Sequence, residues 1–229
     1  MNMRKKIGNI LTYIGIACIL VIVLFPILWA VTTSLKTGRQ AQSIPPVWLF
    51  RPSFHNYIAA FVKRNFGRLL VNSLIVSLSA TFLSVILGSL AGYALARFQI
   101  KGKNLILMWI LSIRMFPPIA AIIPFFLLYN KLGLIDTRLG LIIAYTAFNL
   151  PFAVWIMQGF FLEVPRELDE AALIDGCSPW RVFFKIVLPL SAPGLVATAI
   201  FTLIFSWNEF MFALILSRSR SQTMPVGVM

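Results

Sequence analysis

Long uncharged apolar runs decide what this chain can fold into. One extends from Ile7 to Leu35 without a charged residue, and a second extends from Leu69 to Ala96. A helix needs about 20 consecutive apolar residues to cross the hydrocarbon core of a bilayer, so each run is long enough. The 229 residues are 59% hydrophobic and only 12% charged, whereas soluble domains carry about 25% charged residues. The chain is therefore predicted to be a membrane protein.

Three further runs follow the same pattern, interrupted by single charges at Arg114 and Glu209. The last span is expected to start later than its apolar run, because prolines at 189 and 193 would interrupt a helix there. We expect an all-α polytopic helical bundle that forms a single transmembrane domain over residues 1–229. Its predicted spans cover residues 10–33, 72–96, 105–128, 139–161 and 192–216.

One predicted span has a regular stripe of small residues. Small residues at every fourth position line one face of a helix and let another backbone approach closely. The sequence therefore predicts tight helix packing along this face. The stripe consists of Ala80, Ser84, Gly88, Gly92 and Ala96.

Basic residues at the edges of the spans indicate the orientation. The run from Arg4 to Lys6 precedes the first span, and Arg97, Lys101 and Lys103 follow the second. Short cytoplasmic loops are enriched in such residues. The N-terminus and the segment 163–191 are therefore predicted to be cytoplasmic, and an uncleaved first span is preferred to a signal peptide because the run is too long for one.

The net charge of +13 does not indicate nucleic-acid binding, because most basic residues flank apolar runs instead of forming a basic face. Cys18 lies within a span, Cys177 lies in a linker, and neither has a Cys or His at ligand spacing. His55 is the only histidine and is expected to be a surface residue. No metal, cofactor or catalytic residue is predicted.

Five of the seven acidic residues fall between positions 163 and 175, at the start of the segment 163–191, which we call the acidic loop. Pro165 suits a helix start, and the acids after it complement the helix dipole. Gly176 suits the left-handed turn that ends a helix, and Ser178-Pro179 suits the start of another. The sequence predicts two short ordered helices. The second is too apolar to face water all round, and the acidic first helix favours a protein partner over lipid.

The loop and its flanks resemble the permeases of ABC importers. Glu170-Ala171-Ala172 is followed after three residues by Gly176, and after nine more by Ile186 and Leu188-Pro189, as in the EAA loop of that family. The flanking stretches PFAVWIMQGFF and FSWNEFMFALIL resemble its carbohydrate, maltose-type branch. The resemblance covers essentially the whole chain.

The resemblance implies a sugar or polyol importer of the bacterial or archaeal cell membrane. It implies three partners: a cytoplasmic ATPase dimer that holds the loop, a second permease subunit forming a heterodimer, and an extracytoplasmic solute-binding protein. The branch usually has six spans and we count five, so a truncated C-terminus is expected. The residues that the resemblance assigns to ATPase coupling are Glu170, Ala171, Ala172, Asp175, Gly176, Ile186, Leu188 and Pro189.

Arg114 and Glu209 are charges within spans. Such charges are costly in lipid and face the interior of a bundle or a wet cavity. With Trp207 and Asn208 they are candidates for a polar sugar path, while a packing role or a contact with the partner permease is the alternative for Glu209.

Two other classes of function compete with an ABC permease. An ion-coupled secondary transporter is the main alternative, although the chain has no internal repeat of the kind common in such proteins. A membrane-embedded enzyme would need clustered catalytic groups. No GxxxxGK[ST] sequence occurs, so ATP hydrolysis is expected on a separate subunit.

Overall fold

The computed structural model describes residues 3–228, and the contacts within it group the chain into two compact units. The first unit runs to Phe66 and the second starts at Gly67. Within residues 3–228 all regular structure is helical, in agreement with the predicted all-α fold. The side chains of Arg4, Lys5 and Lys6, on which the predicted orientation partly rests, lie outside the described part.

The first unit is dominated by helix α1 (Met3–Ser34), which contains the predicted span 10–33. The helix is apolar on every side, and its described side chains are exposed along most of its length. A helix that is hydrophobic all round belongs in a protein core or in a membrane. Residues Leu11–Ser34 have the length and hydropathy of a span, so lipid or a partner chain is the expected surrounding.

The end of α1 is fixed by the short helices α2 (Gly38–Ala41) and α3 (His55–Lys63) and the segment between them. Asn56 Nδ2 donates hydrogen bonds to the carbonyl oxygens of Ser34 and Lys36, at 3.0 and 2.7 Å. Lys36 is buried, with Nζ about 5 Å from the ring centres of Trp29 and Phe50. The linker after the first span is therefore ordered.

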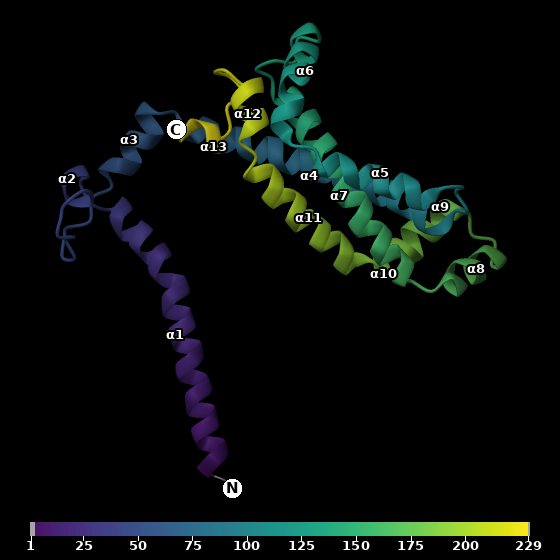
Figure 1. Cartoon of the computed structure of the whole chain (residues 1–229), viewed down its shortest axis with the longest axis horizontal. Coiled ribbons are helices and arrows are strands. Elements are labelled where there is room, and N and C mark those ends of the chain that lie inside the picture. The colour runs from purple at the N-terminus through teal and green to yellow at the C-terminus, as the bar shows by residue number, and fades with distance from the viewer. Residues whose placement is uncertain (1–2, 229) are drawn as a thin grey trace. The chain divides into compact units, whose positions relative to one another are not determined.

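In the second unit, helices α4 (Phe66–Arg97), α5 (Lys103–Met115), α7 (Arg138–Glu163) and α11 (Ala192–Trp207) run along one another (Figure 1). Of these, α4 and α7 are each long and apolar enough to cross a membrane unaided. The predicted stripe of small residues packs α4 onto α7. A Cβ atom added at Gly88 would lie only 2.5 Å from Ala153 Cβ, so the close approach requires glycine.

Two buried clusters hold this unit together. The first joins α4 and α7 to α6 (Pro118–Lys131) and α12 (Met211–Leu216), with Tyr145 and Phe212 among its largest side chains. The second joins the other ends of α4 and α7 to the acidic loop, around Phe161 and Phe183. Because α4 and α7 take part in both clusters, they connect the two ends of the unit.

Two predicted spans are broken in the structure. Within 105–128, Phe116 and Pro117 are extended, and the helices on either side bend by 91°. The cause is Pro117-Pro118, because a residue before proline avoids the helical conformation. Within 192–216, helix α11 ends at Trp207 and α12 starts at Met211. The carboxylate of Glu209 accepts hydrogen bonds from the N–H groups of Phe212 and Ala213, which starts the new helix.

Candidate functional site

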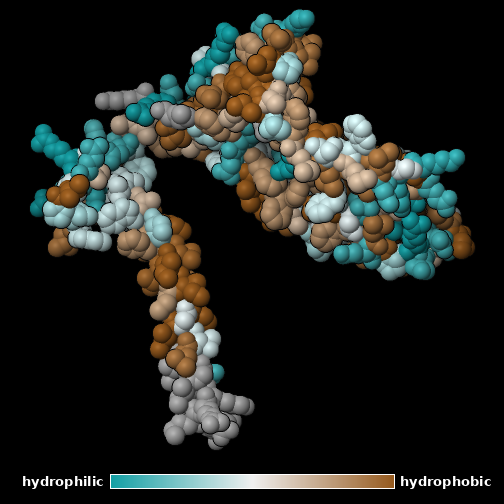
Figure 2. Space-filling view, viewed as in Figure 1, coloured by the Kyte–Doolittle hydropathy of each residue, from teal (hydrophilic) through white to brown (hydrophobic). Residues whose placement is uncertain are grey.

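The acidic loop forms helix α8 (Arg166–Ile174), followed by α9 (Pro179–Val182), the π-helical turn η1 (Phe183–Val187) and α10 (Leu188–Leu190). Helix α8 starts one residue after Pro165, which is its N-cap. The two predicted helices are therefore present, and the second contains a π-helical turn that the sequence does not predict. Figure 2 shows hydrophilic side chains gathered at this end of the unit.

The turn between α8 and α9 has the predicted chemistry. Gly176 has a φ of +81°, the left-handed conformation that a side chain disfavours. A Cβ atom there would meet nothing within 4 Å, so the backbone conformation is the whole constraint. Ser178 Oγ then accepts a hydrogen bond from Arg181 N–H at 3.4 Å, and Pro179 is the first residue of α9. The turn is built from local signals in the sequence.

Helix α8 has an inner and an outer face. Asp169 and Ala172 are buried against the rest of the unit, and Ala172 belongs to the second buried cluster. Glu170, Ala171 and the large side chain of Ile174 are exposed. Among the residues predicted for coupling, Glu170, Ala171, Asp175 and Gly176 therefore share an accessible surface, whereas Ala172 packs inward.

The other predicted coupling residues lie in the second half of the loop. Ile186 and Leu188 are half-buried against the second cluster, and Pro189 is exposed on α10. Their neighbour Phe183 is buried, with its ring centre 4.7 Å from that of Tyr93 on α4. This half of the loop therefore anchors it to the bundle.

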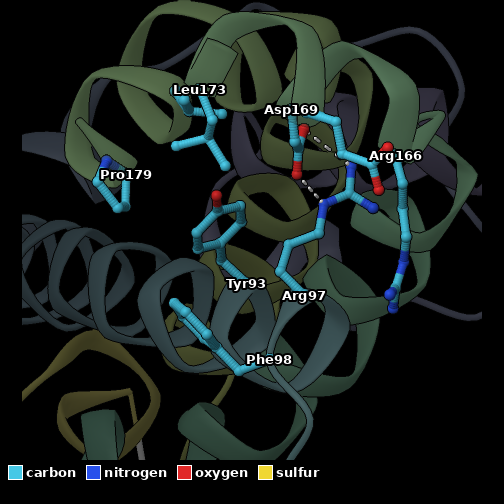
Figure 3. Close-up of a pocket in the computed structure, with 9 residues that line it drawn as sticks. Tyr93, Arg97, Phe98, Arg166, Asp169, Leu173 and Pro179 are labelled. Carbon is cyan, nitrogen blue, oxygen red and sulfur yellow. Dashed lines mark hydrogen bonds and ion pairs between the residues drawn. The ribbon is translucent and has the colours of Figure 1, made fainter. Parts of the chain in front are cut away.

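An ion pair joins α8 to the end of α4 (Figure 3). Arg97 Nε lies 2.6 Å from Asp169 Oδ2, and the two side chains are only 7% and 12% exposed. Arg97 Nη2 also donates a hydrogen bond to the Val164 carbonyl oxygen at 2.9 Å. Burial raises the pKa of the Asp169 carboxyl above its ordinary value, and the Arg97 guanidinium opposes that rise. A cavity of about 210 Å³ lies beside the pair, between α4 and the loop.

The residues predicted for a polar path gather around a second cavity of about 290 Å³. Arg114 from α5, Asn208 and Glu209 line it, whereas Trp207 is not among its lining residues. Both in-span charges are thus next to one cavity. In the described part of the chain no ion pair joins them, because the carboxylate of Glu209 caps α12.

Arg114 is held by rings and neutral polar groups. Its guanidinium carbon lies 4.2 Å from the ring centre of Phe205, and Nη1 donates a hydrogen bond to the Phe148 carbonyl oxygen at 3.2 Å. Asn149, 3.5 Å from the same nitrogen, donates to Ser206 Oγ at 2.8 Å. Asn149 and Ser206 were not predicted, because the candidates were the two charges within spans and the two residues before Glu209. A polar amide in the middle of the predicted span 139–161 was the available signal.

Comparisons with known proteins agree on one family. Residues 84–225 match the family described as binding-protein-dependent transport system inner membrane component. The chain is 42% identical to a probable ABC transporter permease protein, y4oR, of Sinorhizobium fredii, over 93% of this chain and 76% of that protein. It is 39% identical to the trehalose transport system permease protein SugB of Mycobacterium tuberculosis, over 90% and 75% of the two chains.

A solved structure has the same fold. It is the crystal structure of a bacterial ABC transporter involved in the import of the acidic polysaccharide alginate. The match covers 100% of this chain and 80% of that one, with a TM-score of 0.79 and 25% sequence identity. The predicted fold class, a helical bundle of the ABC-importer permease kind, is confirmed.

Proposed function

Because the chain belongs to the family of binding-protein-dependent transport system inner membrane components, we propose that it lines the path of a sugar or polyol and couples to an ATPase through the acidic loop. Relatives in the family are named as ABC transporter permeases, and one is named for trehalose. A permease of this kind is a membrane subunit and works with other proteins. ATP hydrolysis is assigned to a separate cytoplasmic subunit.

The observation that carries the coupling role is the division of α8 into two faces. Its inner face is anchored to the bundle through Asp169 and Ala172, while Glu170, Ala171 and Ile174 face outward. Ile174 is 86% exposed. It lies on α8, an acidic helix outside the apolar spans. An exposed apolar side chain beside carboxylates suits a protein surface with a hydrophobic hollow and basic residues. The ATPase dimer is the partner that fits.

This role places α8 on the cytoplasmic side of the cell membrane, with the N-terminus on the same side. The remaining partners are a second permease subunit, as a heterodimer, and an extracytoplasmic solute-binding protein. The exposed apolar surface of α1 is available to lipid or to the second permease.

The cavity around Arg114 is the proposed substrate path. Sugars bind through hydroxyl groups that both donate and accept hydrogen bonds, and through apolar ring faces that pack on aromatic side chains. Arg114, Asn149 and Asn208 supply polar groups, and the rings of Phe148 and Phe205 supply apolar surface. An ion-coupled transporter would use the same cavity, so dependence on ATP separates the two functions.

Gly176→Val tests the coupling role. Valine at a φ of +81° is strained, so the turn that presents α8 should change while membrane insertion is retained. We expect ATP-dependent uptake of sugars and polyols by cells that express the complete importer to be lost. Gly159→Val is the matched control, because a Cβ at Gly159 meets nothing within 4 Å and its φ is ordinary.

The contrary result is equally clear. Normal uptake by Gly176→Val, with the ATPase still bound, would show that this turn has no coupling role. Uptake that continues without the ATPase and follows an ion gradient would instead support a secondary transporter.

A further inference from the structure

Two arginine side chains link α4 and α8, one extending from each helix to the other. Arg97, in the last turn of α4, reaches the carboxylate of Asp169 on α8 and the Val164 carbonyl oxygen. Arg166, in the first turn of α8, donates from Nη2 to the carbonyl oxygen of Ala96 at 3.0 Å. The end of one helix and the start of the other are therefore joined by two side chains, and Figure 3 shows the contact of Arg97 with Asp169.

The ion pair between Arg97 and Asp169 is buried, which makes separation of the two helices costly. Removing one partner of a buried pair leaves an uncompensated charge away from water. The same penalty applies when the helices move apart without admitting water. Arrangements in which α8 leaves α4 are therefore disfavoured, and the two helices should move together.

The backbone segments just before and just after α8 constrain its direction only weakly. Before α8, Val164 and Pro165 have extended backbones. After α8, the chain turns at Gly176 with a positive φ and no side chain to pack. Neither segment continues the helix, so each permits rotation that a continuous helix would resist. The packing of Ala172 in the second buried cluster and the side-chain link to α4 therefore fix the direction of α8 together.

Helix α4 can carry a displacement through the bundle. It is continuous over 32 residues and contributes to both buried clusters. Its close packing on α7 at Gly88 and Gly92 leaves little room for bending. A shift at Arg97 therefore moves the whole helix.

We propose that the Arg97–Asp169 ion pair is a positioning contact that makes α8 and α4 move as one body, so that displacement of the exposed face of α8 reaches the bundle through α4. The inference rests on the proposed coupling role of the acidic loop. Neither residue needs to touch the ATPase, because Asp169 lies on the inner face of α8 while Glu170 and Ala171 lie on the outer one. Asp169 and Arg97 are positioning residues in this scheme.

The test uses the complete importer, with both permeases, the ATPase and the solute-binding protein, in lipid nanodiscs. The readout is ATP hydrolysis with the solute-binding protein divided by hydrolysis without it. Asp169→Asn keeps the shape of the side chain and removes its charge. We expect the ATPase to remain bound and the stimulation ratio to fall by about tenfold, within the range of typical coupling energies.

Two further variants separate positioning from folding. Reversal of the pair, Arg97→Asp with Asp169→Arg, should restore much of the ratio, which a general loss of packing would not. Arg97→Lys keeps a cation beside Asp169 and should give a smaller loss than Asp169→Asn. Glu163→Gln and Lys101→Gln are matched controls, because both residues are exposed charges near the same ends of the helices and should leave the ratio unchanged.

Three results would overturn the inference. An unchanged ratio for Asp169→Asn would show that the pair does not transmit motion, and the coupling role tested by Gly176→Val would still stand. Loss of ATPase binding by Asp169→Asn would place Asp169 in the docking surface. Failure of all variants of the pair to assemble, the reversed one included, would make the pair a folding element only.

Discussion

Two aspartates at opposite ends of α7 are held in different ways. Asp169 follows α7 and pairs with one guanidinium in a buried setting. Asp136 precedes α7, and its carboxylate accepts hydrogen bonds from the backbone N–H groups of four successive residues, Arg218 to Ser221. Hydroxyl groups of Ser219 and Ser221 add two more. One aspartate is bound by a single movable side chain, and the other by the main chain itself.

The pKa values of the two carboxyl groups shift in opposite directions. Burial raises the pKa of both, but at Asp136 the four backbone N–H groups outweigh burial and hold the pKa well below its usual range. At Asp169 burial prevails over the guanidinium groups of Arg97 and Arg166, so the pKa of its carboxyl is raised. The comparison indicates that the Asp136 end is a clamp made by the main chain, whereas the acidic loop is joined to α4 by an ion pair between two side chains.

The Asp136 end is tied to α4 as well. Asn72 Nδ2 donates to the carbonyl oxygens of Arg220 and Gln222, and its Oδ1 accepts from Arg138 Nε at 2.8 Å. The N–H of Met224 donates to Ser73 Oγ at 2.7 Å. The segment after α12 is therefore held between α4 and the turn before α7.

The largest expected effect is that of Asp136→Ala on this clamp. The substitution removes every carboxylate hydrogen bond to residues 218–221. Hydrogen bonds to charged groups contribute about 1.5–3 kcal/mol each, so trypsin should cleave at Arg218 and Arg220 at least about tenfold faster in detergent. Glu163→Ala, which removes an exposed acid, is the control. An unchanged cleavage rate would mean that the clamp does not restrain this segment.

A smaller effect is expected from pH, and it separates the two aspartates directly. The chain has only three aspartates, so protein labelled with carbon-13 at the aspartate carboxyl groups gives few signals. Variants in which each aspartate in turn is replaced by asparagine assign the signals to residues. Asp169 should titrate above the ordinary value of about 3.9, and Asp136 below it. Reversal of this order would refute the comparison.

The sign of each shift predicts how stability depends on pH. The lowered pKa of Asp136 means that its stabilisation is complete above the pKa of the unfolded chain and is lost only in stronger acid. The raised pKa of Asp169 means that the folded state holds the proton of this carboxyl more tightly than the unfolded chain does. The stabilisation that Asp169 contributes is therefore lost as pH rises from the pKa of the unfolded chain to that of the folded protein. Mild acid should therefore not weaken the fold through Asp169, whereas stronger acid should release the clamp at Asp136.

Local signals in the sequence predicted most of the acidic loop. The left-handed turn at Gly176, the capping hydroxyl of Ser178 and the packing stripe through Gly88 and Gly92 depend on residues close together in sequence. The all-α fold was predicted from the long apolar runs, and the family was predicted from one ordered motif. Both are local signals, and both predictions are confirmed.

Contacts between distant residues were not predicted. Arg97 and Asp169 are far apart in the chain, and nothing in either segment shows that α4 and α8 become neighbours. Asp136 was likewise missed, because its partners are backbone groups beyond α12. The break at Glu209 was missed because hydropathy averages over a run and does not register where the backbone hydrogen bonds of a helix stop, whereas the prolines at 117, 118 and 124 did indicate a kink or break in the third span. Tertiary neighbours decide these features, and a single sequence does not specify them.

We propose that the outer face of α8 holds a cytoplasmic ATPase. Photo-crosslinking in native membranes tests it most directly, with a crosslinking amino acid placed at Ala171 or, as the matched control, at Ala172. Ala171 is exposed and Ala172 is buried in the second cluster. We expect a crosslink from position 171 to a nucleotide-binding ATPase, and from position 172 only within the chain. A position 171 that reaches lipid or no protein, under every nucleotide condition, would contradict it.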